Sequence, residues 1–266
     1  MMSVTKVGDG GLRIIDEIRK KVVPMRPAWI AALFLALLWP SGTPAATPKS
    51  MRVIVEQGNG GPEVLSLRVA PVLVPATGEV LIRVYAASVN PADTKIRRGL
   101  LFQVTQPIVP GMDVAGVIEK VGAGVRNLKP GEPVWAVIGR TEATSPRGLN
   151  GGYAEFVIVS AARVMPKPRR MTYAQAAGVG VAGLAAARYL EPLKLGPGKT
   201  LLITGVAGGV GSVAAQIAKA EGARVIGTAT AAHNEYLRSI GVDRVIDYSA
   251  GPFEEEVHAV DAVFDT

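Results

Sequence analysis

Three glycines between residues 200 and 230 have the types and spacing most suited to chemistry in this chain. The segment TLLITGVAGGVGSVAAQIAKAEGARVIGTAT reads as an apolar strand, a glycine turn, a small-residue helix and a second apolar strand. Gly205, Gly208 and Gly211 give the spacing GxxGxxG, in a turn that follows a strand and opens a helix. A helix start offers unpaired N–H donors and a partial positive charge to a pyrophosphate. The pattern predicts a dinucleotide-binding turn; the alternative is a turn that only packs tightly.

The second strand bears on which nucleotide would bind. NAD-selective sites place a carboxylate at the end of this strand, about 20 residues after the glycine turn. Here that position falls in 227–234, GTATAAHN, which contains no Asp or Glu. A 2′-phosphate therefore meets no repulsion from this segment, which favours NADPH over NADH. The residues predicted to bind the cofactor are Gly205, Ala207, Gly208, Gly209, Val210, Gly211, Thr228, Thr230 and His233, with Asn234 as a further hydrogen-bonding side chain.

Composition argues against several classes of function. The chain has 266 residues, 48% hydrophobic and 19% charged, which is ordinary for a globular protein of one or two domains. Its net charge of +7 comes from 29 basic and 22 acidic residues without a long run of like charge, so nucleic-acid binding is not expected. The chain has no cysteine and its two histidines are His233 and His258, so no zinc site of the usual ligand types is expected.

The first fifty residues are predicted to lie outside the fold. Residues 29–39, WIAALFLALLW, form an apolar run that follows basic residues and precedes small ones. A helix needs about 20 apolar residues to cross a bilayer, so no stable membrane span is expected in the mature chain. The order of basic, apolar and small residues is typical of an export signal at 25–46. The alternative is translation from Met51, so the chain is exported or periplasmic in the first case and cytoplasmic in the second.

Two folded domains are expected after this extension. Short strand-like segments separated by Gly and Pro turns predict a β-rich domain over 51–170, a small barrel or sandwich. Over 171–266 strands alternate with helices, which predicts an α/β domain with a doubly wound parallel sheet. Thr172 and Gln175 have the spacing of a capping box before a helical run. The further elements expected are a strand at 224–228, a helix at 232–239, a strand at 244–247, a helical stretch at 253–258 and a strand at 262–265.

The last residues, DAVFDT, form an apolar strand. A buried parallel strand is an unusual terminus, so the α/β domain is interpreted as incomplete and the chain as a fragment of a longer enzyme. A free sheet edge is expected to favour aggregation of this fragment.

Five stretches after residue 50 resemble the zinc-free quinone oxidoreductase (zeta-crystallin-like) branch of the medium-chain dehydrogenase/reductase superfamily. They cover nearly all of this part of the chain, and their combination is typical of the family. The stretches are GGPEVL at 60–65, GEVLIRVYAASVNPADTKIRRG at 78–99, PGMDVAGVIEKVGAGV at 110–125, GGYAEFVIV at 151–159 and ITGVAGGVGSVAAQIAKAEGARVIGTA at 203–229.

The resemblance implies a GroES-like substrate domain followed by a Rossmann domain, with NADPH bound between them. Zinc-dependent relatives have a Gly-His-Glu segment where this chain has Gly111-Met112-Asp113, which agrees with the metal-free branch. Lys95, Leu101 and Ala185 stand where relatives often carry an aromatic residue, a second aromatic residue and a threonine, so the choice of substrate stays open. Val181, with Ala182 and Gly183, lies where the family has cofactor contacts, although core packing is an equal alternative.

Without a metal, hydride must pass to an acceptor that stabilises its own negative charge, such as a quinone or an enone. Asn90 is the first candidate to donate a hydrogen bond to the developing enolate, with an Asn-Pro turn as the alternative. Asp93 is expected to orient the same loop, or to cap a helix. Lys95 is a candidate contact to the enolate or to a cofactor phosphate, or else a solvated side chain. Tyr153 is expected to pack on a strand with its hydroxyl at the surface.

Three functions therefore stay open from sequence. The leading one is an NADPH-dependent quinone or enone reductase acting on a small molecule. The others are a non-catalytic NADPH-binding fragment and a relative of the enoyl reductases or alcohol dehydrogenases. Export conflicts with NADPH use, because NADPH is scarce outside the cytoplasm. The family resemblance implies a homodimer for a full-length chain.

Overall fold

The computed structural model describes residues 46–101, 106–139 and 147–266, and Pro48–Thr266 form one compact unit. The predicted export signal at 25–46 lies outside the described residues except for its last position. Within the described ranges, the structure holds no helix with the length and apolarity needed to cross a membrane.

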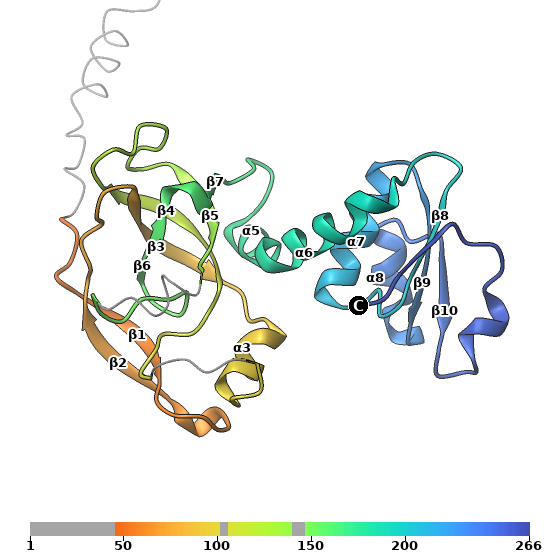
Figure 1. Ribbon diagram of the computed structural model, residues 1–266, viewed down its shortest axis with the longest axis horizontal. Coiled ribbons are helices and arrows are strands. Elements are labelled where there is room, and N and C mark those ends of the chain that lie inside the picture. The colour runs from red at the N-terminus through yellow and green to blue at the C-terminus, as the bar shows by residue number, and fades with distance from the viewer. Residues whose placement is uncertain (1–45, 102–105, 140–146) are drawn as a thin grey trace, which may run out of the picture. The chain divides into compact units, whose positions relative to one another are not determined.

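The first part of this unit is rich in antiparallel strands, as expected (Figure 1). A hairpin of β1 and β2 accompanies a five-stranded sheet in the order β6-β3-β4-β5-β7. β3 lies between two cores, since Val80 and Ile82 face one core and Leu81 faces another. The strands are β1 (Ser50–Glu56), β2 (Leu65–Pro71), β3 (Glu79–Ala87), β4 (Asp113–Val121), β5 (Pro133–Val137), β6 (Phe156–Ser160) and β7 (Val164–Pro166).

Two elements here are additions to the sequence prediction. The three-residue strand β7 pairs with β5, and it is too short to give a periodic pattern. Helix α3 (Pro91–Arg97) follows β3 after a short connection, with Pro91 in its first turn. Proline at this place is favourable because the first N–H groups of a helix have no partner within it. The segment after Asn90, for which the sequence suggested a turn, is therefore a helix next to the end of β3.

The helical run after Thr172 forms two helices, α5 (Tyr173–Gly178) and α6 (Gly180–Leu190). The predicted capping box is confirmed, because the Gln175 N–H donates to Thr172 Oγ1 at 3.2 Å and Gln175 Oε1 accepts from the Thr172 N–H at 2.9 Å. The break falls at Val179, whose ψ of −4° departs from helical geometry. The N-terminus of α6 is thereby separated from α5 and available for a cap.

The second part is the expected α/β region, with a parallel sheet in the order β10-β9-β8-β11 (Figure 1). Its glycine turn runs from β8 (Thr200–Ile203) to α7 (Gly209–Ala220), and β9 (Arg224–Ala229) follows. The strands expected at 224–228, 244–247 and 262–265 are observed as β9, β10 (Arg244–Asp247) and β11 (Ala262–Phe264). The helix expected at 232–239 is a 3₁₀ turn followed by α8 (Asn234–Ser239), and the stretch expected at 253–258 is a 3₁₀ helix at Phe253–Glu256.

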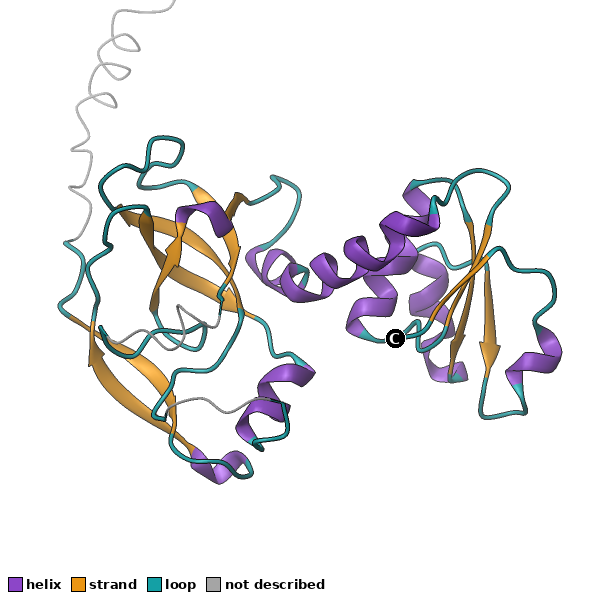
Figure 2. Cartoon of the chain, in the orientation of Figure 1, coloured by secondary structure: helices purple, strands orange, loops and turns teal. Residues whose placement is uncertain are grey.

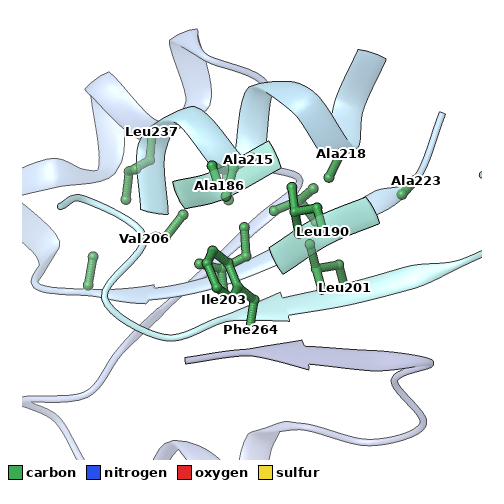
Figure 3. Packing of buried hydrophobic residues seen from close by; sticks show 14 residues of the cluster. Ala186, Leu190, Leu201, Ile203, Val206, Ala215, Ala218, Ala223, Leu237 and Phe264 are labelled. Carbon is green, nitrogen blue, oxygen red and sulfur yellow. The ribbon is translucent and has the colours of Figure 1, made fainter. Parts of the chain in front are cut away.

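The main core of this region lies between the sheet and helices on one of its faces (Figure 2). Figure 3 shows Leu201, Ile203 and Phe264 of the strands beneath alanines of α6 and α7, among them Ala186 and Ala215. Small side chains let these helices approach the strands closely. The glycine turn is thus held at the end of a well-packed layer.

The opposite face of the sheet carries a smaller core. Buried Leu202, Ile226 and Ile246 project there and pack against Phe253, Val257 and Val260. This cluster is much smaller than the one beneath the helices, and Val263 of the edge strand β11 is 55% exposed.

Candidate functional site

The glycine turn has the backbone geometry that a phosphate site requires. Gly205 has a φ of +61°, in the left-handed region. A Cβ on Gly211 would lie 2.7 Å from the Gly205 carbonyl oxygen and 2.8 Å from the Val206 Cα, so no side chain fits there. Gly208 and Gly209 are exposed where α7 begins. The first N–H groups of this 12-residue helix have no partner within the helix, which fits a bound pyrophosphate.

The end of β9 supports this turn from below. Thr228 is 3% exposed, and its Oγ1 accepts a hydrogen bond from the Gly205 N–H at 3.2 Å. The Val206 N–H donates to the Thr228 carbonyl at 3.1 Å. Thr228 therefore braces the glycine turn from within the fold, and its predicted cofactor contact stays a prediction.

The loop after β9 brings two other predicted residues together. Thr230 Oγ1 and His233 Nδ1 lie 3.0 Å apart, and the imidazole is exposed. Asp247 at the end of β10 joins this loop, since its Oδ2 accepts from the Ala231 N–H at 3.0 Å. The sequence placed no carboxylate at this loop, because Asp247 lies 16 positions from Ala231 and reaches it only through strand pairing.

A second cluster gathers at the end of β3 around Asn90. Asn90 Nδ2 donates to Asp113 Oδ2 at 2.9 Å and to Ser88 Oγ at 3.1 Å. The Ser88 hydroxyl also donates to Asp113 Oδ2, at 2.7 Å. Both bonds start from the Asn90 amide nitrogen, so the side chain is held against Ser88 and Asp113. The predicted donation from Asn90 to an enolate stays a prediction.

Asp113 links this cluster to helix α6. Its Oδ1 accepts from the Val181 N–H at 2.9 Å, which caps the helix with a side chain from β4. Gly180 permits this approach, because a Cβ there would lie 2.3 Å from the same oxygen. Burial raises the pKa of Asp113, while donation from Asn90, Ser88 and Val181 opposes the rise. Val181, predicted as a cofactor contact, thus offers its backbone to Asp113.

Asp93 joins the cluster from the first turn of α3. Its Oδ2 accepts from the Asn90 N–H at 2.7 Å and from the Tyr153 hydroxyl at 3.2 Å. Burial raises the pKa of Asp93, and burial together with the neighbouring Asp93 raises the pKa of Tyr153. The expectation that the Tyr153 hydroxyl lies at the surface is wrong, since the ring is half-buried and its hydroxyl bonds inward.

The candidate catalytic residues therefore separate into two groups. Asn90 and Asp93 lie together in one hydrogen-bond network. Lys95 is exposed on α3, outside the hydrogen bonds of this network. Sequence reasoning missed Ser88 and the bonds made by Asp113, whose only local signal was the segment GMD.

The chain contains no cysteine and two histidines. In the ranges that the structure describes, no three His, Cys, Asp or Glu side chains are grouped as metal ligands.

Comparison with known proteins agrees with this two-part architecture. Residues 76–169 match the alcohol dehydrogenase GroES-like domain, and residues 209–266 match the zinc-binding dehydrogenase family. The NADPH-dependent alkenal/one oxidoreductase of Arabidopsis thaliana chloroplasts is 40% identical over 228 residues, covering 83% of this chain and 58% of the relative. The quinone oxidoreductase of Rattus norvegicus is 39% identical over 189 residues, covering 70% of this chain and 54% of the relative.

The solved structure of the quinone oxidoreductase from Coxiella burnetii resembles this chain with a TM-score of 0.73 and 32% sequence identity. The alignment covers 81% of this chain and 68% of that protein. The chain thus spans somewhat more than half the length of the two enzymes compared by sequence, and about two thirds of this one. By its domains, its fold and its relatives, the chain belongs to the medium-chain dehydrogenase/reductase superfamily.

Proposed function

We propose that this chain is an NADPH-dependent oxidoreductase that transfers hydride to a quinone or another α,β-unsaturated carbonyl compound without a metal ion. The glycine turn between β8 and α7 carries the proposal. It supplies exposed backbone at a helix N-terminus, where Gly211 leaves no room for a side chain and Thr228 fixes the turn from below. This arrangement suits the pyrophosphate of a dinucleotide.

The substrate class is supported by what the named relatives share. They include an alkenal/one oxidoreductase, a 2-methylene-furan-3-one reductase and quinone oxidoreductases. The names quinone and 2-methylene-furan-3-one denote a carbonyl conjugated with a carbon–carbon double bond, and alkenal/one denotes a carbonyl compound that contains such a double bond. When hydride adds to the β-carbon of such a compound, the electron pair moves to the carbonyl oxygen and a proton from water completes the reduction.

NADPH supplies the hydride when it is bound. The backbone N–H groups of Gly209 and its neighbours would hold the pyrophosphate, and Thr230 and His233 would face the ribose. Asn90 and Asp113 do not need to move a proton in this scheme. They hold the end of β3 and the start of α6 in fixed positions through the bonds of the Asn90 network.

The donor chemistry supports a reaction without zinc. A zinc enzyme uses cysteine, histidine or carboxylate ligands in sets of three or four. The chain has no cysteine, and the carboxylates of the Asn90 network already accept hydrogen bonds from side chains and backbone.

A pair of matched acceptors tests the proposal with the full chain. Methyl vinyl ketone and butanone differ only in the conjugated double bond, so consumption of NADPH with the first and not the second is expected. Benzoquinone is expected to act as the first does, and EDTA is expected to leave the rate unchanged.

The outcomes separate the alternatives. NADPH binding, measured by nicotinamide fluorescence, without turnover of any acceptor would favour a binding protein. Reduction of butanone, or inhibition by EDTA, would contradict conjugate reduction without a metal.

A further inference from the structure

Strand β10 brings a carboxylate to the loop that follows β9. The two strands pair in parallel with Asp247 opposite Ala229, so both lie at the C-terminal end of the sheet. Asp247 Oδ2 accepts from the Ala231 N–H at 3.0 Å, and Oδ1 accepts from the N–H and hydroxyl of Ser249 at 2.9 and 2.5 Å. The carboxylate is therefore held in a defined place on the loop of Thr230 and His233.

This carboxylate is ionised at neutral pH. Donation from Ser249 and from Ala231 lowers the pKa of Asp247. The three donors are two backbone N–H groups and a hydroxyl, all uncharged, so these bonds orient the negative charge without neutralising it.

The position of this charge bears on nucleotide choice. In dinucleotide-binding sheets, the adenosine ribose lies at the C-terminal end of the second strand of the glycine-turn unit. Here that strand is β9, which ends at Ala229, the partner of Asp247. A carboxylate at this end accepts a hydrogen bond from a ribose 2′-OH and repels a 2′-phosphate.

Thr230 and His233, on the same loop, offset the repulsion between Asp247 and a 2′-phosphate only in part. Thr230 Oγ1 and His233 Nδ1 bond to each other at 3.0 Å, which uses part of the capacity that each would offer a phosphate. The loop thus presents one fixed negative charge beside an imidazole and a hydroxyl that already share a hydrogen bond.

We propose that Asp247 is a specificity-determining residue. Its carboxylate makes the preference for NADPH over NADH smaller, so that the chain also binds NADH. This inference rests on the proposed function, which requires a reduced nicotinamide nucleotide, and concerns only the choice between the two. The sequence alone does not reveal this role, because Asp247 reaches the loop from the neighbouring strand.

Binding measurements on the full chain test this directly. Asp247→Asn keeps an oxygen for the Ala231 N–H and removes the charge. The ratio of the Kd for NADH to the Kd for NADPH is expected to rise about five- to tenfold, as for loss of one unit charge near a phosphate in water. Ser249→Ala, which removes a donor and keeps the charge, is expected to leave the ratio within about twofold.

Two probes without nicotinamide isolate the 2′-phosphate. Adenosine 2′,5′-bisphosphate is expected to bind Asp247→Asn more tightly than the unsubstituted chain, whereas AMP, whose 2′-OH would donate to the carboxylate, is expected to bind the variant no more tightly. In the unsubstituted chain, added salt is expected to raise the preference for NADPH because it screens a repulsion. This last measurement applies even if the Asn variant fails to fold.

Each outcome has one meaning. A nucleotide ratio unchanged in folded Asp247→Asn, or a preference for NADPH that falls with salt, would overturn the inference and leave the proposed function standing. Failure of the unsubstituted chain to bind either nucleotide would overturn the proposed function and the inference with it. The predicted rise in the ratio supports both.

Discussion

Glu56 is a fully buried carboxyl at the end of β1 with one oxygen unsatisfied. Its Oε1 accepts from Gln106 Nε2 at 2.9 Å, while Glu56 Oε2 and Gln106 Oε1 are buried without a partner among the residues that the structure describes. Two acceptors are left over, so ionisation of this carboxyl would place a charge on an oxygen that receives no hydrogen bond. Burial raises the pKa of Glu56, opposed by Gln106 and by Arg97 and assisted by Asp93. Burial thus favours the neutral form of Glu56.

Glu56→Gln is therefore expected to stabilise the protein above neutral pH. The raised pKa of Glu56 means that the folded state binds more protons than the unfolded chain, so stability is lost as pH rises from the unfolded value of 4.5 through the folded value. An amide supplies the N–H permanently, and a gain of about 1 kcal/mol at pH ~8 is expected. Guanidinium unfolding followed by circular dichroism between pH ~5 and ~8 measures this gain.

Glu155 provides a control, because its pKa is shifted in the opposite direction from that of Glu56. It is more exposed, and its hydrogen bonds from the Arg52 N–H and guanidinium lower its pKa. Its small contribution is present above the unfolded pKa and is lost as pH falls, so Glu155→Gln should destabilise slightly at neutral pH. If Glu56→Gln instead destabilises the chain at every pH, the neutral carboxyl is wrong.

Helix α6 depends on a cap from outside its own segment. Asp113 accepts from Val181 and Asn90, and a negative charge at a helix N-terminus is favourable. Asp113→Asn removes the charge and places an N–H among donors, so a loss of about 1–3 kcal/mol is expected. Chemical unfolding and the fluorescence of bound NADPH measure the two consequences.

Exchanging the side chains of Asn90 and Asp113 distinguishes loss of the hydrogen bond between them from general destabilisation of the fold. Asn90→Asp alone sets two carboxylates against each other. Combined with Asp113→Asn, it restores one donor and one acceptor, because the introduced amide on β4 would donate to the introduced carboxylate and still accept from the Val181 N–H. The double variant is expected to be more stable than the sum of the single losses predicts. Strict additivity would show that Asn90 and Asp113 are not coupled.

The glycine turn allows a matched comparison within α7. Gly211→Ala forces a Cβ against the backbone of Gly205 and Val206, so a loss of about 1–3 kcal/mol and of NADPH binding is expected. A Cβ on Gly209 meets no atom within 4 Å, and alanine favours a helix. Gly209→Ala should therefore fold as stably as the unsubstituted chain by thermal unfolding. Equal stability of the two variants would contradict the close approach at Gly211.

The elements predicted correctly are those with a local signal. The unit from β8 through α7 to β9 combines apolar strands, glycines and a small-residue helix in 31 consecutive residues, TLLITGVAGGVGSVAAQIAKAEGARVIGTAT. The break between α5 and α6 was missed, because helical residue types continue on both sides of Val179. Helix α6 starts with a cap from Asp113, which lies 68 positions away in the sequence.

In the candidate site, too, the residues with a local sequence pattern could be predicted, and those positioned by distant contacts could not. Asn90, Asp93 and the turn glycines carry local patterns, and the structure places the first two in one network. The contacts of Asp113 and Asp247 arise from tertiary packing and strand register, which a single sequence does not display. The sequence predicts a surface hydroxyl for Tyr153, because its hydrogen-bond partner Asp93 lies 60 positions away.

The two faces of the parallel sheet are unequally covered. Helices α6, α7 and α8 bury one face, whereas the other is covered by Phe253 and a few neighbours. Within the described residues β11 pairs with β8 alone, and its Val263 is 55% exposed. An exposed strand edge beside an apolar side chain is a template for pairing with a second copy.

Concentration-dependent self-association through β11 is therefore expected, and sedimentation velocity of the purified chain measures it. Val263→Lys should weaken it about tenfold or more in apparent Kd, because a charge on an edge strand opposes pairing. Val74→Lys is the matched control, since Val74 is 75% exposed but lies before β3, outside the parallel sheet. A chain that sediments as a monomer over the whole concentration range, or a Val74→Lys variant that dissociates as readily, would show that the β11 edge does not drive assembly.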